Sequence, residues 1–104
     1  MSSPIQIDLL YFEGCPSYKN AWSDLLDVVV EQNLNVSVRP INVDNLDKAN
    51  DLKFAGSPSI KINGVDLEEY EGQGVMACRV YQENDNKGWP SKDLLEKRLL
   101  EAAM

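Results

Sequence analysis

The segment IQIDLLYF, residues 5–12, begins with apolar and polar residues in alternation and becomes continuously apolar from Leu9 to Phe12. This pattern is typical of a strand that is buried on both faces, near the centre of a sheet. A short turn follows, and then Cys15 and Pro16. Proline is favoured at the first position of a helix because the N–H that it lacks has no helical partner there. The sequence therefore predicts a buried strand that leads through a turn into a helix beginning at about Pro16.

A crossover helix and a second strand are predicted next. Apolar side chains recur at three- and four-residue intervals over residues 16–32, which predicts a helix with one broad buried face, and Asn33 can end it in the left-handed conformation. Residues 35–43 read as a strand, and Pro40, which lacks a ladder donor, places that strand at a sheet edge. A strand, a helix and a strand in this order form a parallel unit with a right-handed crossover.

A short helix and a hairpin signal follow this unit. Asp44 or Asn45 can cap a helix that runs to about Phe54. Residues 57–64 contain alternating isoleucines and end in Asn-Gly. Because Asn-Gly is the preferred pair in a tight two-residue turn, this segment is expected to form a strand that enters a hairpin.

The remaining residues are predicted to form a loop, a strand and a helix. Residues 64–77 hold four acidic residues, three glycines and no basic residue, which favours a solvated surface loop over a cation site. Residues 77–82 have the composition of a further strand. Residues 91–103 have the pattern of a terminal helix with Ser91 as its N-cap. The order strand, helix, strand, helix, strand, strand, helix predicts a single α/β domain over residues 1–104, with a four-stranded mixed sheet and three helices.

Composition narrows the possible chemistry. The chain has no histidine, and its 10 basic residues against 17 acidic ones give a formal charge of −7. Such a surface repels phosphate backbones and anionic membranes, so neither nucleic acid nor a membrane is an expected partner. Histidine-dependent hydrolysis and histidine-ligated zinc are excluded, and two cysteines are too few for a four-thiolate zinc site. What remains is chemistry by one thiol or by two thiols that meet in the fold.

Targeting signals are not evident in the sequence. No apolar run approaches the roughly 18 residues that span a bilayer, and residues 1–7 lack the basic and apolar regions of a signal peptide. We therefore expect a cytoplasmic protein.

Cys15 is the first candidate for a functional thiol. At the N-terminus of a helix, the helix dipole stabilises a thiolate, which is the nucleophilic form of cysteine. Glu13 opposes this effect because a nearby negative charge disfavours the thiolate. A free cysteine is also one of the most frequently buried residues, so position alone leaves Cys15 open as a nucleophile or as a small core side chain.

Two motifs and their order give the chain a resemblance to a known superfamily. The sequences FEGCPSY at a helix start and AGSPSIKING after a second helix resemble the thioredoxin and glutaredoxin superfamily. The segment CRVY, residues 78–81, is similar to one found in small prokaryotic thioredoxin-like proteins. The resemblance implies a thioredoxin-like fold with Cys15 as the nucleophile. It places Pro16, Ser17, Tyr18, Ser57 and Pro58 around the substrate.

Within this resemblance, Pro58 is expected to follow a cis peptide bond, and Ser57 is expected to present backbone groups to an extended thiol substrate. Without the resemblance, a trans-proline that opens an edge strand is the simpler interpretation of Pro58. The chain departs from the dithiol pattern at Tyr18, which stands where the second cysteine would be. Tyr18 can donate a hydrogen bond to a thiolate or simply pack at the surface.

Cys78 decides how a reaction at Cys15 can be completed. If the acidic loop folds back over the helix start, Cys78 can approach Cys15 to disulfide distance and act as the resolving thiol. If residues 77–82 pair with residues 59–63 as a hairpin, Cys78 lies about 16 Å along the strand from Pro58. The strand pattern slightly favours this second arrangement, in which Cys78 is a buried structural residue.

These observations lead to one functional hypothesis and two alternatives. The hypothesis is thiol–disulfide exchange by Cys15, as a monothiol or with Cys78 as its resolving partner, on a small thiol such as glutathione or on a protein disulfide. No cofactor is expected. The alternatives are a non-catalytic module that binds a protein or a soft metal, and an iron–sulfur carrier of the monothiol-glutaredoxin kind that uses Cys15 and external thiols.

Overall fold

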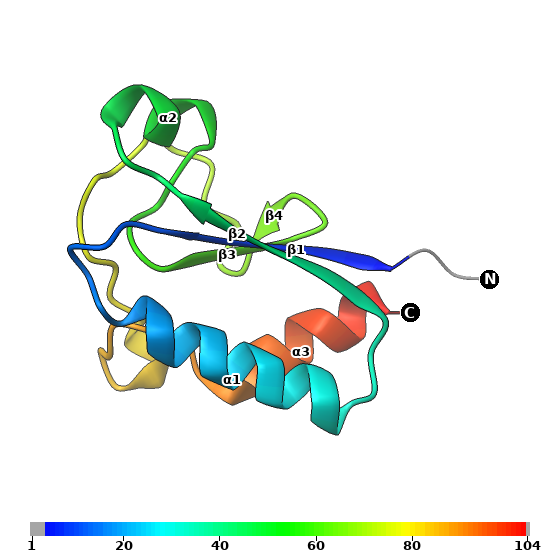
Figure 1. Ribbon diagram of the computed structural model, residues 1–104. Helices are drawn as coiled ribbons and strands as arrows, with labels where there is room; N and C mark the ends of the chain where they lie inside the picture. Colours follow the sequence, from blue (N-terminus) through cyan, green and yellow to red (C-terminus); the bar gives the residue numbers. More distant parts are fainter. Residues whose placement is uncertain (1–3, 104) are drawn as a thin grey trace.

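A computed structural model describes residues 4–103, and these residues form a four-stranded mixed sheet with three α-helices (Figure 1). The strands lie in the order β2-β1-β3-β4. Their bounds are β1 Ile5–Tyr11, β2 Val36–Asn42, β3 Ser59–Ile62 and β4 Val65–Asp66. The helices are α1 Tyr18–Glu31, α2 Leu46–Asp51 and α3 Lys92–Ala102, and a 3₁₀ turn covers Gln82–Asn84. Helices α1 and α3 lie together on one face of the sheet, and α2 lies on the other side (Figure 1).

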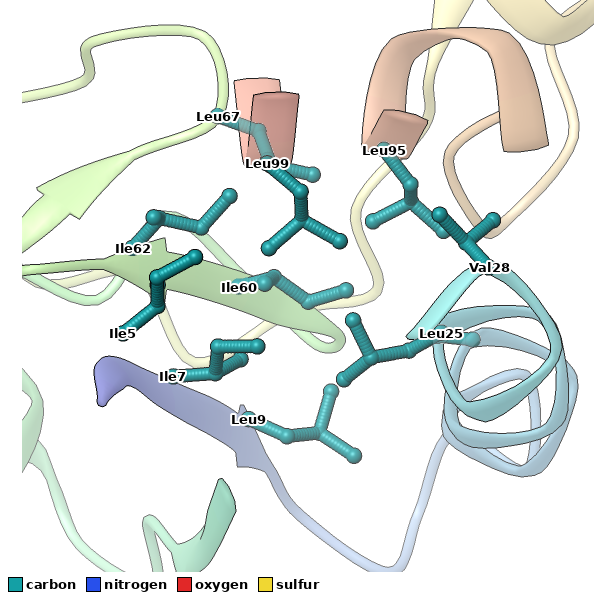
Figure 2. Packing of buried hydrophobic residues seen from close by; sticks show 11 residues of the cluster. Ile5, Ile7, Leu9, Leu25, Val28, Ile60, Ile62, Leu67, Leu95 and Leu99 are labelled. Atoms are coloured by element: carbon teal, nitrogen blue, oxygen red, sulfur yellow. The ribbon is translucent and has the colours of Figure 1, made fainter. Parts of the chain in front are cut away.

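Strand β1 is the centre of the sheet, as its apolar sequence predicts. It pairs in parallel with β2 and antiparallel with β3. Ile7 and Leu9 pack with Leu25 of α1 and Leu99 of α3 in the larger core cluster (Figure 2). Leu10 points to the opposite face, where it joins the smaller cluster under α2. Burial of both faces explains why this strand has lost strict alternation.

The predicted caps are confirmed, although α2 ends at Asp51 and not at about Phe54 as the sequence predicts. Asn33 has a φ of 51°, which is the left-handed conformation expected after α1. The side chain of Asn45 accepts a hydrogen bond from the Lys48 amide at 2.8 Å, so Asn45 rather than Asp44 caps α2. Ser91 caps α3 by accepting from the amide of Leu94 at 3.1 Å.

Helix α1 begins later than the sequence predicts. The α-helix starts at Tyr18, with Ser17 as its N-cap, and not at Pro16. The amide of Lys19 donates to the carbonyl of Pro16 at 3.1 Å, a bond of the tighter 3₁₀ type. Cys15 therefore stands just before a tight turn that leads into α1.

The fourth strand also lies elsewhere in the sequence than predicted. Asn63 and Gly64 both have positive φ, 52° and 87°, and this tight turn reverses the chain at once. The partner of β3 is therefore the segment that follows directly, β4, and not residues 77–82. Residues 77–82 make only isolated bridges, through Cys78 and through Tyr81.

The loop between β4 and Cys78 runs past α2. The amide of Gly74 donates to the side chain of Asn50 at 2.9 Å, and the amide of Val75 donates to the carbonyl of Phe54 at 2.8 Å. These bonds return the chain to the end of β3 at which that strand begins. Over residues 4–103, no helix has both the length and the apolar character needed to cross a bilayer.

Candidate redox site

A disulfide joins Cys15 and Cys78, whose Cα atoms are 5.8 Å apart and which are separated by 63 positions in the sequence. Cys15 is only 1% exposed, whereas Cys78 is exposed. The interpretation of Cys78 as a buried strand residue is therefore wrong. The two thiols that composition left available for chemistry meet in the fold.

Residues 77–79, which we call the covering segment, bring Cys78 to this position. The amide of Ser57 donates to the carbonyl of Ala77 at 2.9 Å, and the amide of Arg79 donates to the carbonyl of Ser57 at 2.9 Å. These bonds form a parallel bridge between Ser57 and Cys78. The hairpin pairing that would have held Cys78 far from Cys15 does not occur, because β4 already occupies the edge of β3 at its other end.

Gly56 permits the close approach of the covering segment. Its φ is 105°, and a Cβ atom at this position would lie 2.9 Å from the carbonyl oxygen of Ala77. Residues other than glycine seldom adopt this conformation. Both the backbone conformation and the lack of space for a side chain thus favour glycine at the position before Ser57.

The peptide bond between Ser57 and Pro58 is cis, as the resemblance predicts. Both residues are buried, and the hydroxyl of Ser57 accepts a hydrogen bond from the amide of Phe12 at 3.2 Å. Both backbone groups of Ser57 that were expected to face a substrate are bonded to the covering segment instead. The structure thus brings Ser57 and Pro58 beside the disulfide.

The three residues that follow Cys15 differ in their exposure and in their contacts. Pro16 is exposed and Ser17 is half-buried. The ring of Tyr18 stacks on Tyr11, with centroids 4.4 Å apart, so Tyr18 packs against the sheet at the half-buried start of α1. The two tyrosines line an apolar groove of about 280 Å³, together with Leu9, Lys19, Trp22 and Pro40.

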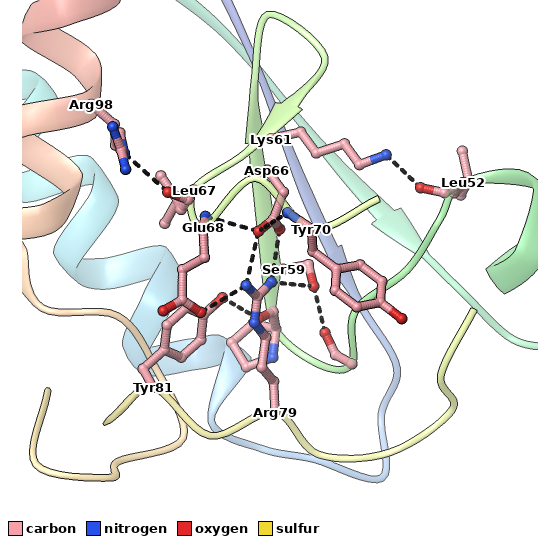
Figure 3. Close-up of polar contacts among 12 residues, drawn as sticks. Leu52, Ser59, Lys61, Asp66, Leu67, Glu68, Tyr70, Arg79, Tyr81 and Arg98 are labelled. Atoms are coloured by element: carbon pink, nitrogen blue, oxygen red, sulfur yellow. Dashed lines mark hydrogen bonds and ion pairs between the residues drawn. The ribbon is translucent and has the colours of Figure 1, made fainter. Parts of the chain in front are cut away.

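Arg79 anchors the covering segment in the protein, and sequence reasoning missed it. Its guanidinium donates to both carboxylate oxygens of Asp66, at 2.7 and 2.8 Å, and to Glu68 at 2.9 Å (Figure 3). It also donates to the hydroxyl of Ser59 at 3.0 Å. The side chains of Arg79 and Asp66 are 7% and 1% exposed, which corrects the interpretation of all the loop acids as solvated. Burial lowers the pKa of Arg79, but the bonds and charges of its partners outweigh burial and leave that pKa raised.

Tyr81 connects the same segment to the cis-proline. Its hydroxyl donates to the carbonyl of Pro58 at 2.7 Å, and its ring lies 4.6 Å from the guanidinium carbon of Arg79. The side chain is fully buried, and this burial is the main cause of a raised pKa for Tyr81. The phenol therefore stays protonated and keeps its role as a donor. The sequence did contain a signal for this arrangement, an arginine and a tyrosine at alternate positions after a cysteine in CRVY. The signal was missed because the acidic partners of the arginine lie in a segment without a regular pattern.

Over residues 4–103, no group of three or more cysteine or acidic side chains is placed together where it could hold a metal ion. Comparisons with protein-family models, with curated proteins and with solved structures found no match. The case for function therefore rests on the geometry of the disulfide and its surroundings.

Proposed function

We propose that this chain is a thioredoxin-like thiol–disulfide exchange protein that uses Cys15 and Cys78 as its redox couple. The observation that carries the proposal is a disulfide between a buried cysteine just before the turn that leads into α1 and an exposed cysteine on a separate segment. Supporting features are the cis-proline beside the pair and the mixed sheet with helices on both faces.

In the reduced protein, Cys15 is the proposed nucleophile. Its thiolate attacks one sulfur of a substrate disulfide, a mixed disulfide forms, and the other substrate sulfur leaves as a thiolate. The thiolate of Cys78 then attacks the Cys15 sulfur and releases the second substrate thiol. Two electrons pass from the cysteine pair to the substrate, and the protein keeps the disulfide.

The start of α1 favours the thiolate of Cys15. The positive end of the helix dipole points toward this turn, and the first turn of α1 contains no acidic residue. In this proposal the dipole outweighs two effects that raise the pKa of Cys15, the nearby charge of Glu13 and the burial of the thiol. Cys78 lacks such a helix start. This difference assigns the lower pKa of the two thiols to Cys15.

Alkylation of Cys15 tests the proposal. In a Cys78→Ser variant, the rate of iodoacetamide reaction is followed by mass spectrometry as a function of pH. The proposal predicts a midpoint well below the ordinary cysteine pKa of about 8.5. The matched Cys15→Ser variant, which reports Cys78, is expected to titrate near the ordinary value. A Cys15 that titrates at or above the value for Cys78 contradicts the assignment.

A further inference from the structure

We propose, on the basis of the function proposed above, that the oxidised protein exchanges with a small monothiol and not with an extended peptide, and that this thiol attacks the sulfur of Cys78. The covering segment occupies the backbone edge that a peptide would need. Cys78 belongs to that segment and is the accessible end of the disulfide.

The edge of the sheet at Ser57 is already paired. An extended peptide that binds to a sheet edge needs free backbone donors and acceptors. Here the Ser57 amide donates to Ala77, and the Ser57 carbonyl accepts from Arg79, both at 2.9 Å. The covering segment thus takes the place of a bound strand, with Cys78 opposite Ser57.

Displacing the covering segment would require breaking its buried anchors. The Arg79 guanidinium would have to leave Asp66, whose side chain is 1% exposed. The hydrogen bond from the hydroxyl of Tyr81 to the carbonyl of Pro58 is a second buried anchor of the same stretch of chain. Separating a buried ion pair leaves an uncompensated charge, which is strongly unfavourable. A small thiol avoids this cost because it needs access to only one sulfur.

Exposure identifies which sulfur a small thiol can reach in the oxidised protein. With the disulfide closed, Cys15 is 1% exposed and Cys78 is exposed. The role of Cys15 as nucleophile, proposed above, applies to the reduced protein, in which this bond is open. Attack by an external thiolate on Cys78 forms a mixed disulfide there and breaks the bond to Cys15, whose sulfur takes the electron pair and leaves as a thiolate. A leaving thiolate that is stabilised by its surroundings leaves faster, which favours departure of Cys15 at the helix start.

A second equivalent of the small thiol completes the reduction. It attacks the external sulfur of the mixed disulfide, forms a small-molecule disulfide and releases the thiolate of Cys78. In total, two small thiols are oxidised, and the protein gains two electrons and two protons. The co-reactant is thus a low-molecular-weight monothiol, the class to which glutathione belongs.

Matched thiols test this proposal on the oxidised full-length protein. One probe is N-acetylcysteine methylamide, and the other is a capped extended peptide with a single central cysteine, so that both thiols have the same immediate chemistry. Reduction is followed by acid quenching, alkylation and mass spectrometry. We expect the small probe to react several-fold faster than the peptide. A peptide that reacts as fast as the small probe, or faster, overturns the proposal.

The Arg79→Met variant shows whether the anchored segment is the cause. Loosening the covering segment is expected to raise the peptide rate relative to the small-thiol rate, whereas Arg39→Met, which removes an exposed ion pair with Asp8, leaves the ratio unchanged. An unchanged ratio in Arg79→Met contradicts the proposal.

Peptide mapping of the quenched reaction locates the adduct. The small probe on Cys78 with alkylated Cys15 supports the proposal, and the reverse pattern overturns it. The rate ratio decides the matter if the adduct decays before it can be trapped. Oxidised protein that contains no Cys15–Cys78 disulfide would refute the proposed function itself, whereas exchange through Cys15 would refute only this inference.

Discussion

Replacement of Arg79 by methionine tests the claim that a buried ion pair holds the covering segment in place. The variant keeps much of the side-chain volume and removes the charge. Asp66 then remains with a side chain that is 1% exposed and has lost both of its guanidinium bonds. Breaking a buried pair from one side costs about 3 to 5 kcal/mol. Glu68 adds little to this figure because its side chain is 41% exposed.

Urea unfolding of the oxidised protein, followed by circular dichroism, measures this loss. We expect Arg79→Met to lower the free energy of unfolding by about 3 kcal/mol or more. The matched control is Arg39→Met, which removes a similar pair with Asp8 at 3.1 Å but from a side chain that is 64% exposed, and it is expected to change stability much less. Adding Asp66→Asn to Arg79→Met should restore part of the loss, because the unpaired carboxylate is then absent.

Three results would refute this reasoning. The first is an Arg79→Met variant within about 0.5 kcal/mol of the parent protein, as for an ordinary surface substitution. The second is an equal loss from Arg39→Met. The third is a double variant that is less stable than Arg79→Met alone.

Three further changes test other parts of the site. Because the pKa of Tyr81 is raised in the folded protein, its contribution to the free energy of unfolding is fully present below the ordinary tyrosine pKa of about 10 and falls as the pH rises above that value. Urea midpoints measured from pH 8 to 11 should therefore fall less steeply in Tyr81→Phe than in the parent protein. Equal slopes would contradict a raised pKa for Tyr81. Gly56→Ala is expected to destabilise the protein by at least about 1 kcal/mol, since its φ of 105° is strained for alanine and its new methyl group meets Ala77; a neutral effect in thermal unfolding would contradict the close approach. Reduction of the Cys15–Cys78 disulfide removes a cross-link over 63 positions and should lower the free energy of unfolding by up to about 4 kcal/mol. Cys78→Ser, which cannot form the disulfide, is the control and should not respond to reductant. Identical urea midpoints of the parent protein before and after reduction would contradict a stabilising cross-link.

Much of the fold was predictable because its signals are local. The apolar run of β1, the proline in edge strand β2, the Asn63-Gly64 turn and the caps at Asn45 and Ser91 each act within a few residues. The fourth strand was misplaced because β4 is only the two residues Val65–Asp66, too short for any periodicity to be seen.

The candidate site was predictable only in part, because it depends on contacts between distant segments. Cys15 and Pro58 belong to motifs that can be recognised in the sequence. Whether Cys78 reaches Cys15 depends on a loop whose path is fixed by a hydrogen bond to Asn50 of α2 and by the buried ion pair of Arg79 with Asp66. Neither contact leaves a pattern in the sequence, since an acidic residue in a loop has the same appearance whether it is solvated or buried.

The position of the Cys15–Cys78 equilibrium tests the central claim most directly. The native protein is equilibrated in a series of glutathione redox buffers, quenched with acid, alkylated and weighed by mass spectrometry to give the fraction oxidised. An exchange protein should titrate reversibly, without denaturant, at a potential within the range of about −270 to −120 mV spanned by thioredoxin-like catalysts. A disulfide that stays oxidised below about −300 mV is structural and contradicts the account, and so does a native protein in which no disulfide forms.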